Sequence, residues 1–90
     1  MATFRKVEIV DAREFKGGIE NGNALVFWVC SLQGLAEYHV GRDIPEHIRL
    51  FQNYASRESE MAYPGDWIER RQNGTFKVTR KQEIATYEEV

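Results

Sequence analysis

Few residues of this 90-residue chain have the type and spacing that catalysis or metal binding requires. His39, Asp43 and His47 are spaced four apart, so one continuous helix would place all three on one face as a potential metal site. Gly41 and Pro45 argue against such a helix. The sequence therefore favours two separate histidines, each solvent-facing or hydrogen-bonded, over a metal site.

The only cysteine, Cys30, is the candidate thiol nucleophile. It ends the apolar run Ala24–Cys30, whereas a reactive cysteine needs a base and an electropositive, partly exposed position. The sequence therefore predicts a reduced thiol buried in the core. The glycines also lack the spacing of a phosphate-binding loop. From these patterns we expect no enzymatic activity, no metal and no cofactor.

The charges are distributed unevenly along the chain. Residues 67–82 include five basic side chains and one acid, whereas residues 17–66 include seven acids and three basic side chains. The basic segment supplies the candidate binding surface, which consists of Trp67, Arg70, Arg71, Lys77 and Arg80. Such residues bind phosphates, stack on bases or form interface hot spots. The alternative is a solvated strand face whose long stems cover apolar surface.

Composition indicates a small globular domain. Hydrophobic residues make up 42% of the chain and the net charge is -2, which excludes wholesale disorder. No segment has the roughly 18 apolar residues of a membrane-spanning helix. Charged residues also interrupt the N-terminal segment where a signal peptide would be apolar. We expect a single domain over residues 1–90, located in the cytoplasm, with no membrane partner.

A β-hairpin must position the candidate surface. Asn73–Gly74 lies between the strand-like runs Trp67–Arg71 and Thr75–Arg80, a strong hairpin signal. A two-residue turn is one alternative, but a three-residue loop with a left-handed glycine pairs Ile68 with Val78 and separates apolar from polar side chains better. In this preferred register the apolar face carries Ile68, Phe76 and Val78, and the polar face carries Glu69, Thr75, Lys77 and Thr79.

Two further hairpin features follow from the same register. Trp67 lies on the outer face, or packs beneath the preceding turn or the first strand. That turn, Pro64–Gly65–Asp66, leads into the hairpin, and we expect the Asp66 carboxylate to accept backbone N–H groups.

The remaining elements are short. Alternation predicts strands over Phe4–Phe15, Leu35–Val40 and Glu60–Tyr63. A change of phase within the first suggests a bulge, or a strand buried on both sides. The segment 43–55 fits either a helix or a strand.

A helix is predicted from about Ala24 to Leu32, although so apolar a run also fits a buried strand. Asn21–Gly22–Asn23 supplies its cap residues and Gly34 its terminator. Together the elements predict an α+β fold, in which a small antiparallel sheet of four or five strands carries one or two helices on one face.

Three short motifs together resemble a family of small, largely uncharacterised proteins encoded by bacteriophages and prophages. They are the Pro-Gly-Asp-Trp-Ile strand of Tyr63–Ile68, the Gly turn of Asn73–Phe76, and the Ile-x-x-Thr-Tyr-Glu tail of Ile84–Glu88. The basic opening strand, Arg5–Phe15, also suits the family. The segment Val78–Lys81 departs from it, since members often have Pro-Cys-Lys-Pro there. The resemblance implies a phage or prophage origin and a bacterial cytoplasm, and brings no catalytic residues.

Three hypotheses for function follow. The first is a non-enzymatic phage accessory protein that binds a host or phage component, as an inhibitor, adaptor or anti-defence factor. The second is binding of nucleic acid or a nucleotide-like anion by the basic hairpin 67–82, which should weaken steeply with salt. The third is a minor virion protein or a homo-oligomeric structural protein.

Overall fold

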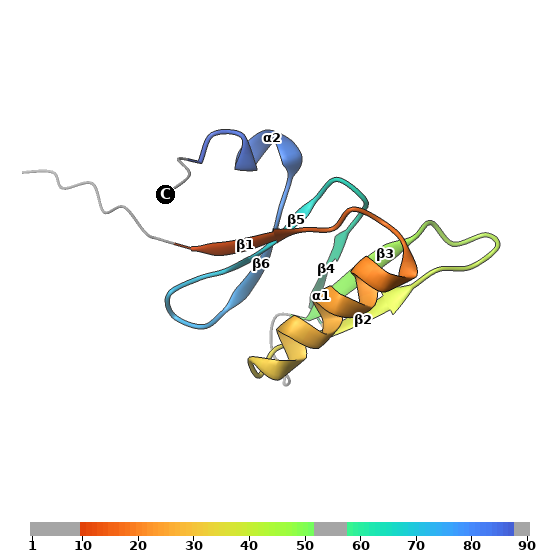
Figure 1. Cartoon of the computed structure of the whole chain (residues 1–90), viewed down its shortest axis with the longest axis horizontal. Helices are drawn as coiled ribbons and strands as arrows, with labels where there is room; N and C mark the ends of the chain where they lie inside the picture. Colours follow the sequence, from red (N-terminus) through yellow and green to blue (C-terminus); the bar gives the residue numbers. More distant parts are fainter. Residues whose placement is uncertain (1–9, 52–57, 88–90) are drawn as a thin grey trace, which may run out of the picture.

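The computed structural model describes residues 10–51 and 58–87. Six strands and two helices occur in this part of the chain, and Figure 1 labels them. In chain order they are β1 (Asp11–Glu14), α1 (Ile19–Ser31), β2 (Leu35–His39), β3 (His47–Phe51), β4 (Ser59–Ala62), β5 (Trp67–Arg70), β6 (Phe76–Thr79) and α2 (Lys81–Ile84).

The strands form two antiparallel sheets of three strands each. One sheet has the order β1-β5-β6 and the other the order β2-β3-β4. The predicted α+β class with antiparallel strands is confirmed. The sequence predicted one sheet of four or five strands, whereas the described strands number six and form two sheets. The sheets are separate because no ladder joins β4 to β6, although these two strands are in contact.

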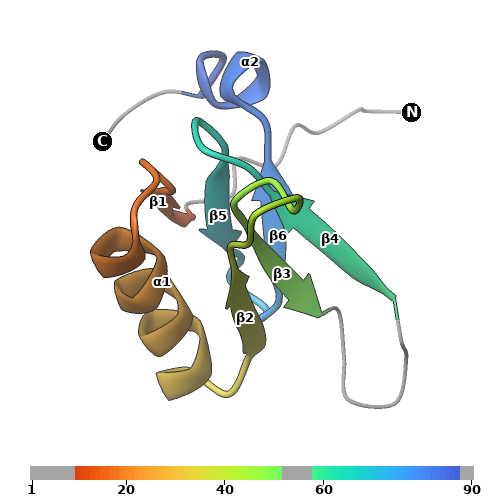
Figure 2. The ribbon, with the colours of Figure 1, turned by 90° about the vertical axis from the view of Figure 1, so that its right-hand side faces the viewer.

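The core lies where α1 and the inner faces of the two sheets meet (Figure 2). Leu25, Trp28 and Val29 extend from α1 toward it, at the three- and four-residue spacing of an amphipathic helix. The rings of Trp28 and Phe76 meet edge to face, with centroids 5.6 Å apart. The helix is thereby fixed against β6, on one side of the β1-β5-β6 sheet.

The helix begins five residues earlier than the sequence suggests. Its N-cap is Gly18, and both Gly17 and Gly18 have a φ of +91°, which L side chains rarely adopt. The predicted cap residues therefore lie inside α1. None of their side chains caps the helix; the side-chain oxygen of Asn21 instead accepts the backbone N–H of Lys16, before the helix, at 2.7 Å.

Gly22 is buried inside α1 for a steric reason. A Cβ at this position would lie 2.4 Å from the ring of Tyr38 on β2. The phenol of Tyr38 hydrogen-bonds to the Glu46 carboxylate, which raises the pKa of that phenol. Glu46 also accepts the backbone N–H of Gly18 at 2.8 Å. This hydrogen bond attaches the β2–β3 loop to the start of the helix.

The C-terminal end of α1 is near its predicted position. Ser31 is the last helical residue, and Gln33, rather than the predicted terminator Gly34, takes the positive φ of 69°. Gly34 completes the cap, since its N–H donates to the Val29 carbonyl at 2.9 Å.

The ambiguous segment 43–55 contains strand β3, while its residues 52–55 lie outside the described part of the chain. The predicted strands Leu35–Val40 and Glu60–Tyr63 are observed within one residue as β2 and β4. Of the predicted first strand, Asp11–Glu14 is observed, whereas residues 4–9 lie outside the described part, so the predicted change of phase is not tested.

The predicted three-residue hairpin loop is confirmed. Ile68 pairs with Val78, the N–H of Arg71 donates to the Thr75 carbonyl at 2.8 Å, and Gly74 has a φ of +87°. The preceding turn is also as predicted, since the Asp66 carboxylate accepts the backbone N–H of Tyr63 at 2.9 Å.

Candidate functional site

The hairpin divides the five candidate surface residues between its two faces. Side chains alternate along a strand. Ile68 is fully buried on the face toward α1, so Arg70 shares that face, while Trp67 and Lys77 lie on the outer face with Glu69. The five residues therefore do not form one continuous surface.

Carboxylates neighbour three of the four cations of the candidate surface. Arg71 Nε lies 3.9 Å from Glu69 Oε1, and Lys77 Nζ lies 3.1 Å from Glu83 Oε1 on α2. Arg80 forms an ion pair with Asp66 and also donates to the Met61 carbonyl at 3.1 Å. The charge excess in the hairpin sequence is thus reduced by carboxylates of the hairpin itself and of the segments on either side.

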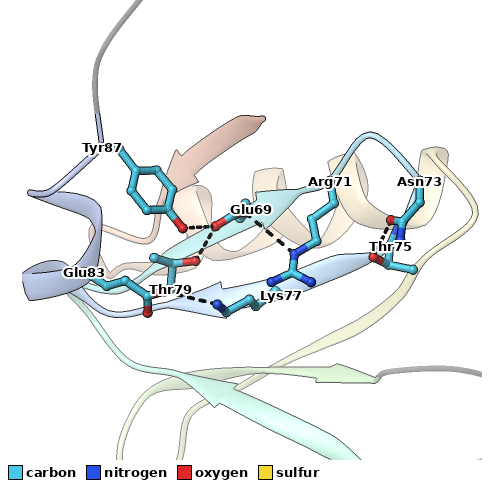
Figure 3. A network of polar contacts seen from close by, with 8 residues as sticks. All are labelled: Glu69, Arg71, Asn73, Thr75, Lys77, Thr79, Glu83 and Tyr87. Carbon is cyan, nitrogen blue, oxygen red and sulfur yellow. Dashed lines mark hydrogen bonds and ion pairs between the residues drawn. The ribbon is translucent and has the colours of Figure 1, made fainter. Parts of the chain in front are cut away.

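Glu69 is the centre of a polar network on the outer face (Figure 3). The residue is 4% exposed, and its carboxylate accepts hydrogen bonds from the hydroxyls of Thr79 and Tyr87, both at 2.7 Å. Hydrogen bonds from two hydroxyls compensate for burying the carboxylate. Burial raises the pKa of the Tyr87 phenol, and the hydrogen bond to Glu69 acts in the same direction.

The network explains why the C-terminal segment lies over the hairpin. None of the four α2 residues is buried, so polar contacts rather than apolar burial connect this segment to the sheet. The sequence placed Glu69 and Thr79 on one face but did not predict the contact with Tyr87. The Thr-Tyr-Glu motif drew attention to Tyr87 but did not indicate its partner.

Arg70 differs from the other hairpin cations. It is partly buried, and its Nε atom is buried without a hydrogen-bond partner among the described residues. Its strand neighbours are Asp11 on β1 and Phe76 on β6. A buried donor without an acceptor is uncommon in folded proteins.

Both histidines are hydrogen-bonded, as expected, but they are neighbours rather than separate. His39 and His47 pair across β2 and β3, and their rings stack with centroids 5.2 Å apart. His47 donates from Nδ1 to the Pro45 carbonyl at 2.8 Å, and His39 Nε2 lies 3.0 Å from the Glu37 carboxylate. The described residues contain no group of three or more His, Cys, Asp or Glu side chains that could hold a metal ion.

Cys30 is exposed, so the prediction of a buried core thiol is wrong. The apolar run was correctly read as helical, but a helix buries only one side. The exposed residues of α1, which make up its outward face, are Ile19, Glu20, Asn23, Ala24, Phe27, Cys30 and Ser31. Phe27 is 77% exposed at the middle of this face.

The outward face of α1 has almost no charge. No charged residue occurs between Glu20 and Glu37, in a chain of which 29% is charged. The exposed side of a helix in a globular protein usually carries charged and polar residues. Exposed aromatic rings and a scarcity of charge are instead typical of the centre of protein interfaces.

Within residues 10–51 and 58–87, no helix combines the length and apolar character that crossing a bilayer requires.

No family model, no curated protein and no solved structure matches this chain.

Proposed function

We propose that this chain is a non-enzymatic phage accessory protein that binds a host or phage protein through the outward face of α1, in the bacterial cytoplasm. The phage origin rests on the resemblance of Tyr63–Ile68 and Ile84–Glu88 to phage and prophage proteins. The observation that carries the binding proposal is the 77% exposure of Phe27 on a face whose only charged residue is Glu20. Burying such a ring against a partner contributes about 1.5–3 kcal/mol.

Binding of nucleic acid by the outer face of the hairpin has less support. Arg71, Lys77 and Arg80 each have a carboxylate within 4 Å, so a phosphate would compete with an acid already in place. A cation in such a pair releases less free energy on binding a phosphate than a solvated cation does. If this alternative holds, affinity for single-stranded nucleic acid should fall steeply as salt rises.

The partner-binding proposal can be tested by capture from bacterial lysate with two matched variants. Phe27→Asp places a charge on the outward face of α1, and Ile44→Asp makes the same change in chemistry at a second exposed residue, in the β2–β3 loop. We expect a specific partner to be retained by the unaltered chain and by Ile44→Asp, and lost with Phe27→Asp. Circular dichroism should show that both variants remain folded, since both residues are exposed.

Two results would contradict the proposal. One is a partner that both variants lose equally, and the other is a partner that both retain. Light scattering of the purified chain tests the homo-oligomer alternative separately. A stable dimer that Phe27→Asp dissociates would assign this face to a second copy of the chain.

A further inference from the structure

Arg70 occupies an unusual position for a cation. Ile68, two residues before it on β5, is fully buried on the face toward α1, so the Arg70 side chain starts from that same face. Its Nε is enclosed and lacks an acceptor among the described residues. A buried N–H without an acceptor carries a desolvation cost that an incoming acceptor would remove.

A second guanidinium lies on the same face. Arg13 pairs with Ile68 while Asp11 pairs with Arg70, so the two arginines are diagonal neighbours on adjacent strands. Such neighbours are about 7–8 Å apart, and somewhat less at their Cβ atoms, a separation that two arginine side chains can bridge through one small anion. Arg13 lies over the Trp28 ring, with 4.4 Å from its Cζ to the ring centroid.

This packing holds Arg13 by its flat face and leaves its N–H groups available. The Arg13 side chain is 51% exposed, so a solute can reach its edge from solvent. Since the guanidinium donors lie in the plane of the group, stacking on Trp28 does not consume them. On the same face, Arg13 thus presents donors that solvent can reach, and Arg70 presents one enclosed donor, its Nε.

Among the described residues, one acid faces these two cations. The Asp11 carboxylate lies 3.9 Å from Arg13, at the outer limit of an ion pair, and its side chain is 60% exposed. Two guanidinium charges against one carboxylate leave a net positive charge on this part of the face. The face therefore has an unsatisfied donor and an excess positive charge at the same place.

We propose that Arg70 and Arg13 form an oxyanion-binding site, which takes a carboxylate or phosphate group between the β1–β5 face and the Trp28 side of α1. The anion accepts from Arg70 Nε and from the exposed edge of Arg13. Planar guanidinium groups match the geometry of both oxyanions. This site lies on the opposite face of the hairpin from the Glu69 network, and it does not depend on the partner-binding proposal for Phe27.

The site can be tested by titration with inorganic phosphate and, separately, with acetate. In a Trp67→Phe background Trp28 is the only tryptophan, and we expect its fluorescence to change as either anion binds next to Arg13. Arg70→Lys keeps the charge but removes Nε, and should weaken binding at least about tenfold. Asp11→Asn should strengthen it. Arg71→Lys, on the outer face, is the matched control and should change neither affinity.

A second measurement does not depend on any variant. In the unaltered chain, NMR should show a large shift of the Arg70 Nε–H resonance on addition of the anion, with a smaller shift for Arg71. Stronger binding of phosphate would indicate a phosphate ester as the ligand, and stronger binding of acetate a carboxylate. An Arg70 resonance that stays in place, or affinity lost equally in Arg70→Lys and Arg71→Lys, would overturn the proposal.

Discussion

The outward face of α1 and the outer face of the β5–β6 hairpin contrast in how their exposed groups are satisfied. On the hairpin, Arg71 and Lys77 lie beside carboxylates, and Glu69 receives two hydroxyl hydrogen bonds. On α1, Phe27 is exposed, and the only charged residue of this helix, Glu20, lies about two turns away. The charged groups on the outer face of the hairpin have partners within the chain, whereas the outward face of α1 exposes apolar surface to water.

This difference shows what a count of charges misses. The five basic residues of segment 67–82 marked the hairpin as the candidate binding surface, yet acids within the segment and at its two borders, Glu69, Asp66 and Glu83, lie beside three of them. A surface with an exposed apolar ring or an unpaired buried donor is a better candidate for binding a partner than a surface with many charges that are already paired. By that criterion Phe27 and Arg70 replace the outer face of the hairpin as the residues of interest.

The largest effect on this comparison should come from removing the centre of the hairpin network. Glu69→Ala deprives Thr79 and Tyr87 of a charged acceptor, and we expect it to lower the free energy of unfolding by about 2–3 kcal/mol. Urea denaturation measures this loss. Glu83→Ala is the matched control, since its exposed pair with Lys77 is worth about 0.5 kcal/mol or less. Equal small losses for both variants would show that the network is not structurally important.

The inner side of α1 provides the next test. Gly22→Ala should raise helix propensity by about 1 kcal/mol, but its Cβ would lie 2.4 Å from the Tyr38 ring. Overpacking of this kind costs about 1–3 kcal/mol. We therefore expect a net destabilisation in thermal or urea unfolding, while Asn23→Ala on the outward face should be neutral or slightly stabilising. A more stable Gly22→Ala variant would contradict the close packing of α1 on β2.

A smaller effect should follow from Tyr87→Phe. This variant removes one hydrogen bond to Glu69 and should cost about 1 kcal/mol or less. Because no α2 residue is buried, we expect the loss to appear locally, as faster amide hydrogen exchange over Lys81–Thr86. Unchanged exchange in this segment would mean that Tyr87 does not hold it in place.

Alkaline pH should weaken the same contact. The pKa of Tyr87 is raised above its ordinary value of 10.0, so the stability that its phenol contributes is complete below pH 10.0. That contribution is lost as the pH rises through the higher folded-state pKa, when a phenolate faces the Glu69 carboxylate. Phenolate absorbance, compared between the unaltered chain and Tyr87→Phe, measures this titration. A Tyr87 that ionises below pH 10.0 would contradict the contact.

The smallest effect on stability belongs to Cys30. Its exposure predicts that Cys30→Ser changes the free energy of unfolding by less than about 0.5 kcal/mol. A thiol reagent should also label the folded chain about as fast as the urea-unfolded chain. Protection of the thiol in the folded state would restore the prediction of a core cysteine and remove one residue from the outward face of α1.

The parts of the fold that depend on local signals could be predicted from the sequence. Asn73–Gly74 and the alternation on either side determined the hairpin register, because only one register separates Ile68 and Val78 from the charged side chains. The Asp66 turn followed from the tendency of its carboxylate to accept nearby N–H groups.

The parts that depend on distant contacts could not be predicted. Apolar character alone did not show which side of the run Ala24–Cys30 faces the core, since that depends on where α1 begins and on Trp28 meeting Phe76. The contact of Tyr87 with Glu69 spans 18 residues and has no local signature. The stacking of His39 on His47 likewise required the pairing of β2 with β3.

The most direct test of the partner-binding proposal is photo-crosslinking in bacterial cells that express the chain. p-Benzoylphenylalanine replaces Phe27 in one variant and Lys77 in another, so that each face of the comparison carries the same reactive group. The proposal predicts a discrete crosslinked protein from position 27 and none from position 77. A discrete adduct from position 77 with none from position 27 would contradict it and return the candidate surface to the hairpin.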